Sequence, residues 1–180
     1  HAVEEVKEGE SVASSDGSAS GNSRRSESVT STKSLGCGLE TAPSGDWYGF
    51  GVVALESREW QLAAARFTEA IRRNQHMSAS FLNRAKANYV LLRYDQCIGD
   101  CESVMELDGN CKEAYLVRGL CRSNAGAYLE AIEDFTTAIS LDSSRMFKQG
   151  YVSRAFAYDM ITKFNNALAD YEEAHRIDPD

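Results

Sequence analysis

Cysteine and histidine are the residues of this sequence whose types and spacing could most readily do chemistry. Cys97 and Cys101 lie four residues apart, so a helix would place both thiols on one face, where they could share a metal ion with a histidine. The chain has only three histidines, His1, His76 and His175, and it contains no Cys-x-x-Cys pair. We therefore expect Cys97 and Cys101 to be buried core thiols, with no metal site and no cofactor.

No motif in the chain indicates acid–base or nucleophilic catalysis. No arrangement of nucleophile, base and orienting acid follows a known pattern, and no glycine-rich loop could hold a phosphate. Acidic clusters occur at Glu130, Glu133 and Asp134 and at Glu172 and Glu173, and we expect them to face solvent. The sequence therefore predicts a protein that is not an enzyme.

The charge balance excludes further classes of function. The 180-residue chain has 19 Lys and Arg residues against 27 Asp and Glu, and this net charge of -8 disfavours binding to nucleic acid or to an anionic membrane. No apolar run is long enough to cross a bilayer. Five cysteines, an odd number in a chain too large to need disulfide staples, indicate free thiols, so we expect a cytoplasmic protein.

The composition changes sharply near residue 44. Residues 1–43 are rich in serine and contain no aromatic residue, so this segment cannot bury enough apolar surface to offset its chain entropy. We predict that it is a disordered arm. From residue 44 to residue 180, apolar residues recur at spacings of three and four, which is typical of amphipathic helices.

The helical part repeats itself with a period of 34 residues, and a fourth copy follows after 36. The columns that align include Trp47, Phe81, Tyr115 and Tyr151; Gly51, Ala85, Gly119 and Ala155; Ala63, Cys97, Ala131 and Ala167; and Phe67, Cys101, Phe135 and Tyr171. The copies span about residues 44–77, 78–111, 112–145 and 148–180. Each copy reads as two helices joined by a tight turn. Because one helix pair cannot bury its apolar face alone, the four pairs should stack into an all-α, right-handed α-solenoid.

This pattern resembles the tetratricopeptide repeat, a 34-residue unit with an aromatic and then a small residue in its first helix and Ala-x-x-x-Phe-x-x-Ala in its second. The resemblance covers about three-quarters of the chain. It departs from the family pattern at the terminal proline, found only as Pro179, and at the turn glycine, found only as Gly126. The resemblance implies a scaffold that holds a peptide or helix of another protein in its concave groove.

The second copy looks particularly like the chaperone-adaptor branch of this family. That branch binds the acidic C-terminal tails of heat-shock chaperones with lysine, asparagine and arginine side chains, because carboxylates entering a groove must be paired. The matching positions here are Tyr48, Val52, Asn83, Glu113 and Val117, of which only Asn83 is a suitable donor. A co-chaperone adaptor is therefore the alternative function.

The inward-facing positions of the first helices instead form a mostly apolar strip, which is typical of a surface that binds a partner helix or a hydrophobic peptide. The strip comprises Tyr48, Val52, Leu55, Leu82, Lys86, Tyr89, Val90, Leu116, Val117, Leu120, Phe156 and Met160, with Asn83 beside it. Some of these side chains could instead pack between neighbouring helices. Our hypothesis is a non-enzymatic protein-binding scaffold. A third possibility is self-association through the groove or through the last helix, whose Leu168 and Tyr171 lie on one face.

Overall fold

The computed structural model describes residues 45–142 and 147–179. All of these residues belong to the unit Ala42–Asp180. The other unit, His1–Thr41, lies outside the described residues, and so does the disordered arm predicted over residues 1–43.

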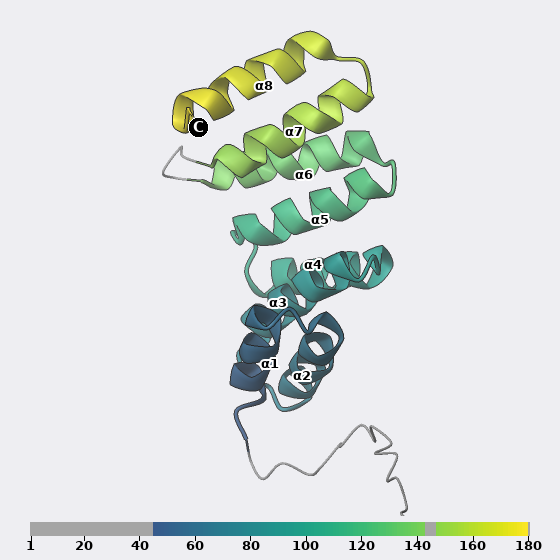
Figure 1. Cartoon of the computed structure of the whole chain (residues 1–180), viewed down its shortest axis with the longest axis vertical. Coiled ribbons are helices and arrows are strands. Elements are labelled where there is room, and N and C mark those ends of the chain that lie inside the picture. The colour runs from purple at the N-terminus through teal and green to yellow at the C-terminus, as the bar shows by residue number, and fades with distance from the viewer. Residues whose placement is uncertain (1–44, 143–146, 180) are drawn as a thin grey trace, which may run out of the picture. The chain divides into compact units, whose positions relative to one another are not determined.

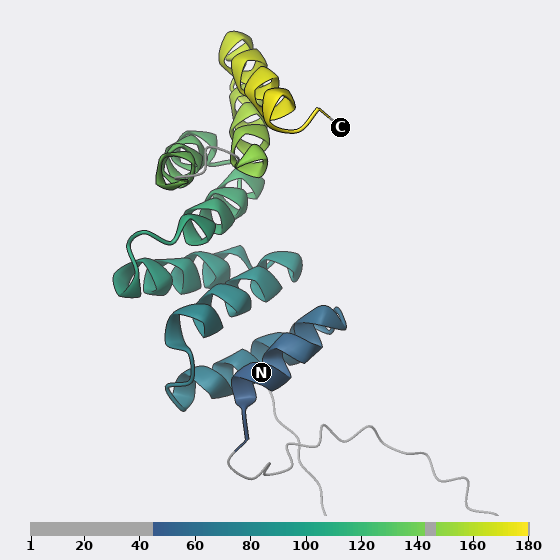
Figure 2. The same ribbon diagram turned by 90° about the vertical axis from the view of Figure 1, so that its left-hand side faces the viewer.

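Eight α-helices and no β-strand make up the described part of the chain (Figure 1). The helices are α1 (Trp47–Glu56), α2 (Trp60–Arg72), α3 (Met77–Val90), α4 (Tyr94–Leu107), α5 (Lys112–Asn124), α6 (Tyr128–Leu141), α7 (Lys148–Met160) and α8 (Phe164–Ile177). Each helix packs on the next, and Figure 2 shows the pairs stacked one after another. This arrangement confirms the predicted α-solenoid. None of the eight helices is long and apolar enough to cross a membrane.

The turn inside each helix pair places one residue in the left-handed backbone conformation. These residues are Arg58, Leu92, Gly126 and Thr162, with φ angles of 60°, 59°, 84° and 60°. Only glycine adopts this conformation without steric cost, and a β-branched residue such as Thr162 is strained there. All four turns keep the same conformation although one alone has the favoured residue, so helix stacking fixes the turns more strongly than local preference does.

The small residue in each first helix lets the second helix approach closely. A Cβ atom added to Gly119 would lie 2.6 Å from the ring of Phe135, which is completely buried, and the first pair has the same combination of glycine and phenylalanine. In the second pair, Ala85 shares a buried cluster with the smaller Cys101. In the first three pairs, glycine is therefore combined with phenylalanine, and alanine with the smaller cysteine.

The core lies at the junctions between successive pairs. Ala87 of α3 belongs to the buried cluster around Phe67 of α2, and Ala157 of α7 belongs to the cluster around Phe135 of α6. All four side chains are completely buried. Since each cluster needs residues from two pairs, no pair buries its apolar face alone.

Candidate functional site

The first helices of the four pairs form one side of the stack. α1 contacts α3, α3 contacts α5 and α5 contacts α7, whereas no two second helices contact each other within the described residues. The first helices are therefore the more closely spaced set, as expected on the concave side of a solenoid. We call the face of α1, α3, α5 and α7 that carries the predicted strip the inner surface, and the side formed by α2, α4, α6 and α8 the outer side.

Several apolar side chains remain exposed on the inner surface. Val90 is 44% exposed, Phe156 51% and Met160 48%. Val152, which is 39% exposed on α7, was not predicted, although it shares a repeat column with Leu82. The repeat spacing was the signal that could have identified it.

Other members of the predicted strip contribute to the core. Leu116 and Val117 are only 6% and 7% exposed, and they belong to two different buried clusters. For these two residues, packing between helices is the observed role. The half-buried side chains that pack against the clusters with part of their surface are Tyr48, Val52, Leu55, Tyr89 and Leu120.

Polar groups lie beside the apolar ones on α3. Asn83 and Lys86 are half-buried, and neither side chain has a hydrogen-bond partner in the described part of the chain. One turn further on, Tyr89 Oη accepts a hydrogen bond of 3.2 Å from Asn124 Nδ2, which connects α3 to α5. Asn83 and Lys86 are thus the polar side chains that a partner on the inner surface could engage.

The positions that match the chaperone-tail site do not assemble a set of donors. Val117 is buried, and the Tyr48 ring packs against the His76 ring with 4.6 Å between centroids. Glu113 is exposed and carries a negative charge. Among the five positions, Asn83 is the one residue of a type that the chaperone-tail site uses, and the other donor side chain is the neutral hydroxyl of Tyr48.

A series of ion pairs joins the two helices of a pair on the outer side. The pairs are Arg84–Asp100, Arg118–Asp134 and Arg154–Asp170, with closest N···O distances of 2.6, 2.7 and 2.7 Å. In each case the arginine is on the first helix and the aspartate follows 16 residues later on the second. Sequence reasoning missed these outer ion pairs, although the constant spacing of arginine and aspartate repeats with the copies.

Each arginine of the outer ion pairs also contacts the second helix of the preceding pair. The contacts are Arg84 with Thr68 at 3.0 Å, Arg118 with Glu102 at 3.6 Å and Arg154 with Thr136 at 3.0 Å. Hydrogen bonding to Asp170 raises the pKa of Arg154 above its ordinary value, so this guanidinium stays charged. One side chain therefore connects three helices at each junction.

The expectation that Asp134 faces solvent is wrong. Its side chain is 3% exposed and accepts hydrogen bonds from Arg118 and Arg122 of α5. The physical reason is that Asp134 lies on the face of α6 that is turned toward α5, where two guanidinium groups compensate its burial. Its neighbours Glu130 and Glu133 are exposed, as predicted.

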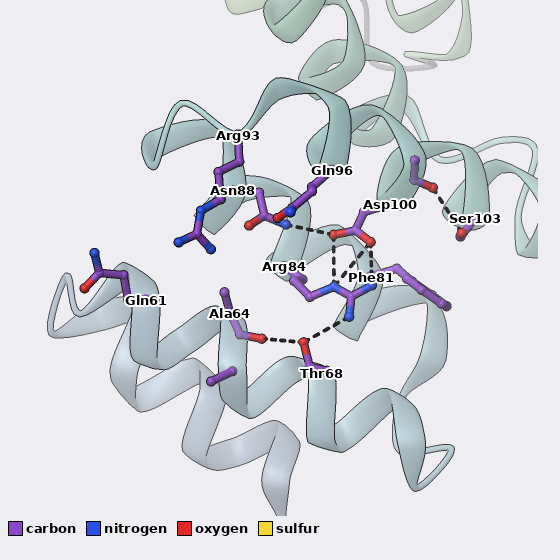
Figure 3. A pocket seen from close by; sticks show the side chains of 12 residues that line it. Gln61, Ala64, Thr68, Phe81, Arg84, Asn88, Arg93, Gln96, Asp100 and Ser103 are labelled. Atoms are coloured by element: carbon purple, nitrogen blue, oxygen red, sulfur yellow. Dashed lines mark hydrogen bonds and ion pairs between the residues drawn. The ribbon is translucent and has the colours of Figure 1, made fainter. Parts of the chain in front are cut away.

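A cleft of about 550 Å³ lies between α2 and α4 on the outer side (Figure 3). Arg84 crosses it from Asp100 on α4 toward Thr68 on α2. Gln61 and Arg93 line the end near the start of both helices. Because Arg84 and Asp100 at the centre of the cleft already form an ion pair with each other, the cleft is less suited to a charged ligand than its lining residues alone would indicate.

The expectation that Cys97 and Cys101 are buried core thiols is confirmed, because both are completely buried and form one cluster with Cys121. Hydrogen bonding to the two neighbouring thiols, together with burial, raises the pKa of Cys97 above its ordinary range. The Cys97 thiol therefore stays protonated, and the three cysteines pack as small apolar groups. The described residues contain no group of three or more His, Cys, Asp or Glu side chains placed to hold a metal ion.

Parts of the chain are similar in sequence to known proteins. No family model matches the chain. The chain is 34% identical over 91 residues to "DnaJ homolog subfamily C member 7 homolog" of Dictyostelium discoideum, a match that covers 48% of this chain and 17% of that protein. It is 36% identical over 92 residues to "Translocon at the outer membrane of chloroplasts 64" of Pisum sativum, covering 51% of this chain and 16% of that protein. The chain thus spans less than a fifth of the length of these two relatives.

Solved structures have the same fold. The Arabidopsis OM64 TPR domain is 30% identical with a TM-score of 0.59, and the match covers 63% of this chain and 92% of that one. The crystal structure of MamA is 17% identical with a TM-score of 0.68, covering 74% of this chain and 77% of that one, and shows the shared fold alone. YrrB, described as a TPR protein with an unusual peptide-binding site, is 22% identical with a TM-score of 0.66, covering 74% and 68%.

Proposed function

Because this chain belongs to the tetratricopeptide repeat family, we propose that it is a non-enzymatic scaffold that binds a peptide or an amphipathic helix of another protein along its inner surface. The observation that carries the proposal is the apolar surface left exposed there at Val90, Phe156 and Met160. Burial of such side chains against a partner would stabilise a complex. The free core thiols favour a reducing, cytoplasmic setting.

The side chains of the inner surface indicate what the partner should contain. Phe156 and Met160 lie one turn apart on α7 and favour apolar residues on one face of the ligand, since methionine adapts to varied shapes. Lys86 on α3 favours an acidic residue, and Asn83 can both donate to and accept from a peptide backbone. We therefore expect a ligand with an apolar face toward α7 and a carboxylate near α3.

A display library of peptides and short helices, selected on the 180-residue chain, tests this proposal. Phe156→Asp should weaken the selected ligands by about tenfold or more, because the incoming apolar surface would desolvate an unpaired carboxylate. Leu129→Asp is the matched control, since Leu129 is 62% exposed but lies on α6. Ligands that tolerate Phe156→Asp and are lost with Leu129→Asp would bind the outer side and contradict the proposal.

A co-chaperone adaptor is the second candidate function, and the relatives named as DnaJ homologues favour it. Against it, the five positions that match the chaperone-tail site contain one residue of the required type, Asn83, and Glu113 would meet a chaperone tail with like charge. Each missing charge-assisted hydrogen bond would remove about 1.5–3 kcal/mol from the affinity of a short peptide. We expect no measurable binding of a labelled peptide that ends in Glu-Glu-Val-Asp. Tight binding that Asn83→Ala abolishes would establish the co-chaperone function instead.

A further inference from the structure

The first and last helices of the stack each have an uncovered apolar face. On α8, Phe164 is 64% exposed, Leu168 58% and Tyr171 38%. On α1, Phe50 is 48% exposed and Val53 61%. The two helices lie at opposite ends of the described series of pairs (Figure 1). No described element covers either face.

At each junction between successive pairs inside the stack, a residue from one repeat column of the first helices packs against a residue from one repeat column of the second helices. The first-helix column is Ala87, Cys121 and Ala157, and the second-helix column of the preceding pair is Phe67, Cys101 and Phe135; all six side chains are completely buried. Val53 occupies the first column in α1, and Tyr171 occupies the second column in α8. Each end of the stack therefore presents one half of a contact that three internal junctions complete.

From this complementarity we propose that copies of the chain stack head to tail, with α1 of one copy packed on α8 of the next. The contact repeats the internal junction in which α7 packs on α6. Val53 is larger than the alanine or cysteine of the internal junctions, so α1 and α8 lie slightly farther apart and bury more apolar surface. The proposal concerns the ends of the stack and is independent of ligand binding on the inner surface.

Charge complementarity supports the same register. At internal junctions, an arginine on a first helix binds two residues. One is the aspartate on the second helix of the same pair, and the other lies on the second helix of the preceding pair, as Arg154 of α7 binds Asp170 of α8 and Thr136 of α6. In the first copy, the position that corresponds to Asp170 holds Arg66. On α8, the position that corresponds to Thr136 holds the exposed Glu172. Head-to-tail stacking brings these opposite charges together, with the guanidinium supplied from α2 instead of the first helix.

A contact between two different faces gives open chains of copies unless its rotation closes into a ring, and a contact that repeats the internal junction continues the solenoid as an open chain. The net charge of -8 on each copy opposes association. We therefore expect weak self-association that continues beyond the dimer as the protein concentration rises. Such chains would also continue the inner surface from one copy to the next.

Sedimentation equilibrium of the 180-residue chain tests the proposal. The average mass of the unmodified chain should rise past that of a dimer at high micromolar concentration. Val53→Asp and Tyr171→Asp should each be monomeric, because each blocks one of the two faces. Their equimolar mixture should form dimers and stop there, since it contains one intact copy of each face. Leu129→Asp, an equal change away from both faces, should associate like the unmodified chain.

Three results would overturn the proposal. They are a strictly monomeric unmodified chain, a Val53→Asp variant that still dimerises through α8 alone, and a mixture that stays monomeric although the unmodified chain associates. Circular dichroism and melting curves establish that each variant folds.

A second test does not place aspartate in an apolar face. Arg66→Glu and Glu172→Arg should each weaken association about two- to fivefold, and the double variant should restore it. Failure of the double variant to restore association would reject this register.

Discussion

The inner surface and the outer ion pairs lie on opposite sides of the same repeats. They differ in whether other residues of the chain pair with their side chains or cover them. On the outer side, Asp134 is 3% exposed and is held by two guanidinium groups. On the inner surface, Phe156 is half exposed and no described residue covers it. The difference separates two tasks, because a satisfied charge network holds the repeats together while an uncovered apolar surface can bind a partner.

The outer ion pairs also fix how one pair sits on the next. Arg84 reaches both Asp100 in its own pair and Thr68 in the preceding one, so its geometry depends on the correct register of three helices. Buried charges that are fully paired disfavour alternative registers, in which they would lose their partners. In the first copy, Phe50 and Arg66 occupy the positions that correspond to the arginine and the aspartate, so the outer ion pairs begin with Arg84 on α3.

The largest effect is expected where the outer ion pairs are broken. Asp134→Ala should lower the free energy of unfolding by about 3 kcal/mol, the lower end of the range for a broken buried ion pair, because Arg118 and Arg122 lose their shared buried carboxylate but are themselves only half-buried. Urea denaturation measures this change. Glu133→Ala, on the adjacent exposed residue, is the control and should change stability by less than about 0.5 kcal/mol. Equal, small effects of both variants would show that the outer ion pairs are not structural.

The fold could be predicted from the sequence because its signal is repeated four times. The columns of aromatic and small residues locate every helix, and a local departure such as Leu92 in a left-handed turn does not change the register. The outer ion pairs were missed because Asp134 lies in an acidic cluster that is otherwise exposed. Its spacing of 16 residues from an arginine recurs in three copies and distinguishes it from Glu133, but the direction in which its side chain points follows from how α6 packs on α5.

Exposure within the candidate site could not be predicted from the columns. Leu116 and Val152 share a column, yet their exposed fractions are 6% and 39%. α5 lies between two other first helices, whereas α7 contacts only α5 among the described first helices. The burial of a column member therefore depends on how many neighbours its helix has, which repeat spacing alone does not encode.

A pair of glycine variants sharpens the comparison between the interior of the stack and its outer side. Gly119→Ala should destabilise the protein by about 1–3 kcal/mol, because the added methyl group would lie 2.6 Å from the buried Phe135 ring. Gly99→Ala on α4 should instead stabilise it by about 0.5–1 kcal/mol, since the space around Gly99 is open and alanine favours the helix. Both changes can be measured by urea denaturation. Destabilisation by both variants to the same extent would contradict the close approach of α5 and α6.

The smallest change in stability is expected on the inner surface itself. Phe156→Asp should change the free energy of unfolding by no more than about 0.5 kcal/mol, because half of the ring is exposed and it belongs to none of the buried clusters. Leu120→Asp should cost about 1–3 kcal/mol, because Leu120 packs against the cluster around Phe135 and the new carboxylate would be partly buried.

Thermal and urea denaturation of both variants compare the two inner-surface positions directly. A near-neutral Phe156→Asp would mean that the fold does not need this ring, so its apolar surface is available to a partner. A loss of more than about 1 kcal/mol at Phe156 would assign the ring to the fold. In that case the exposed apolar surface would have an internal explanation, and the proposed binding site would have to be sought elsewhere on the repeats.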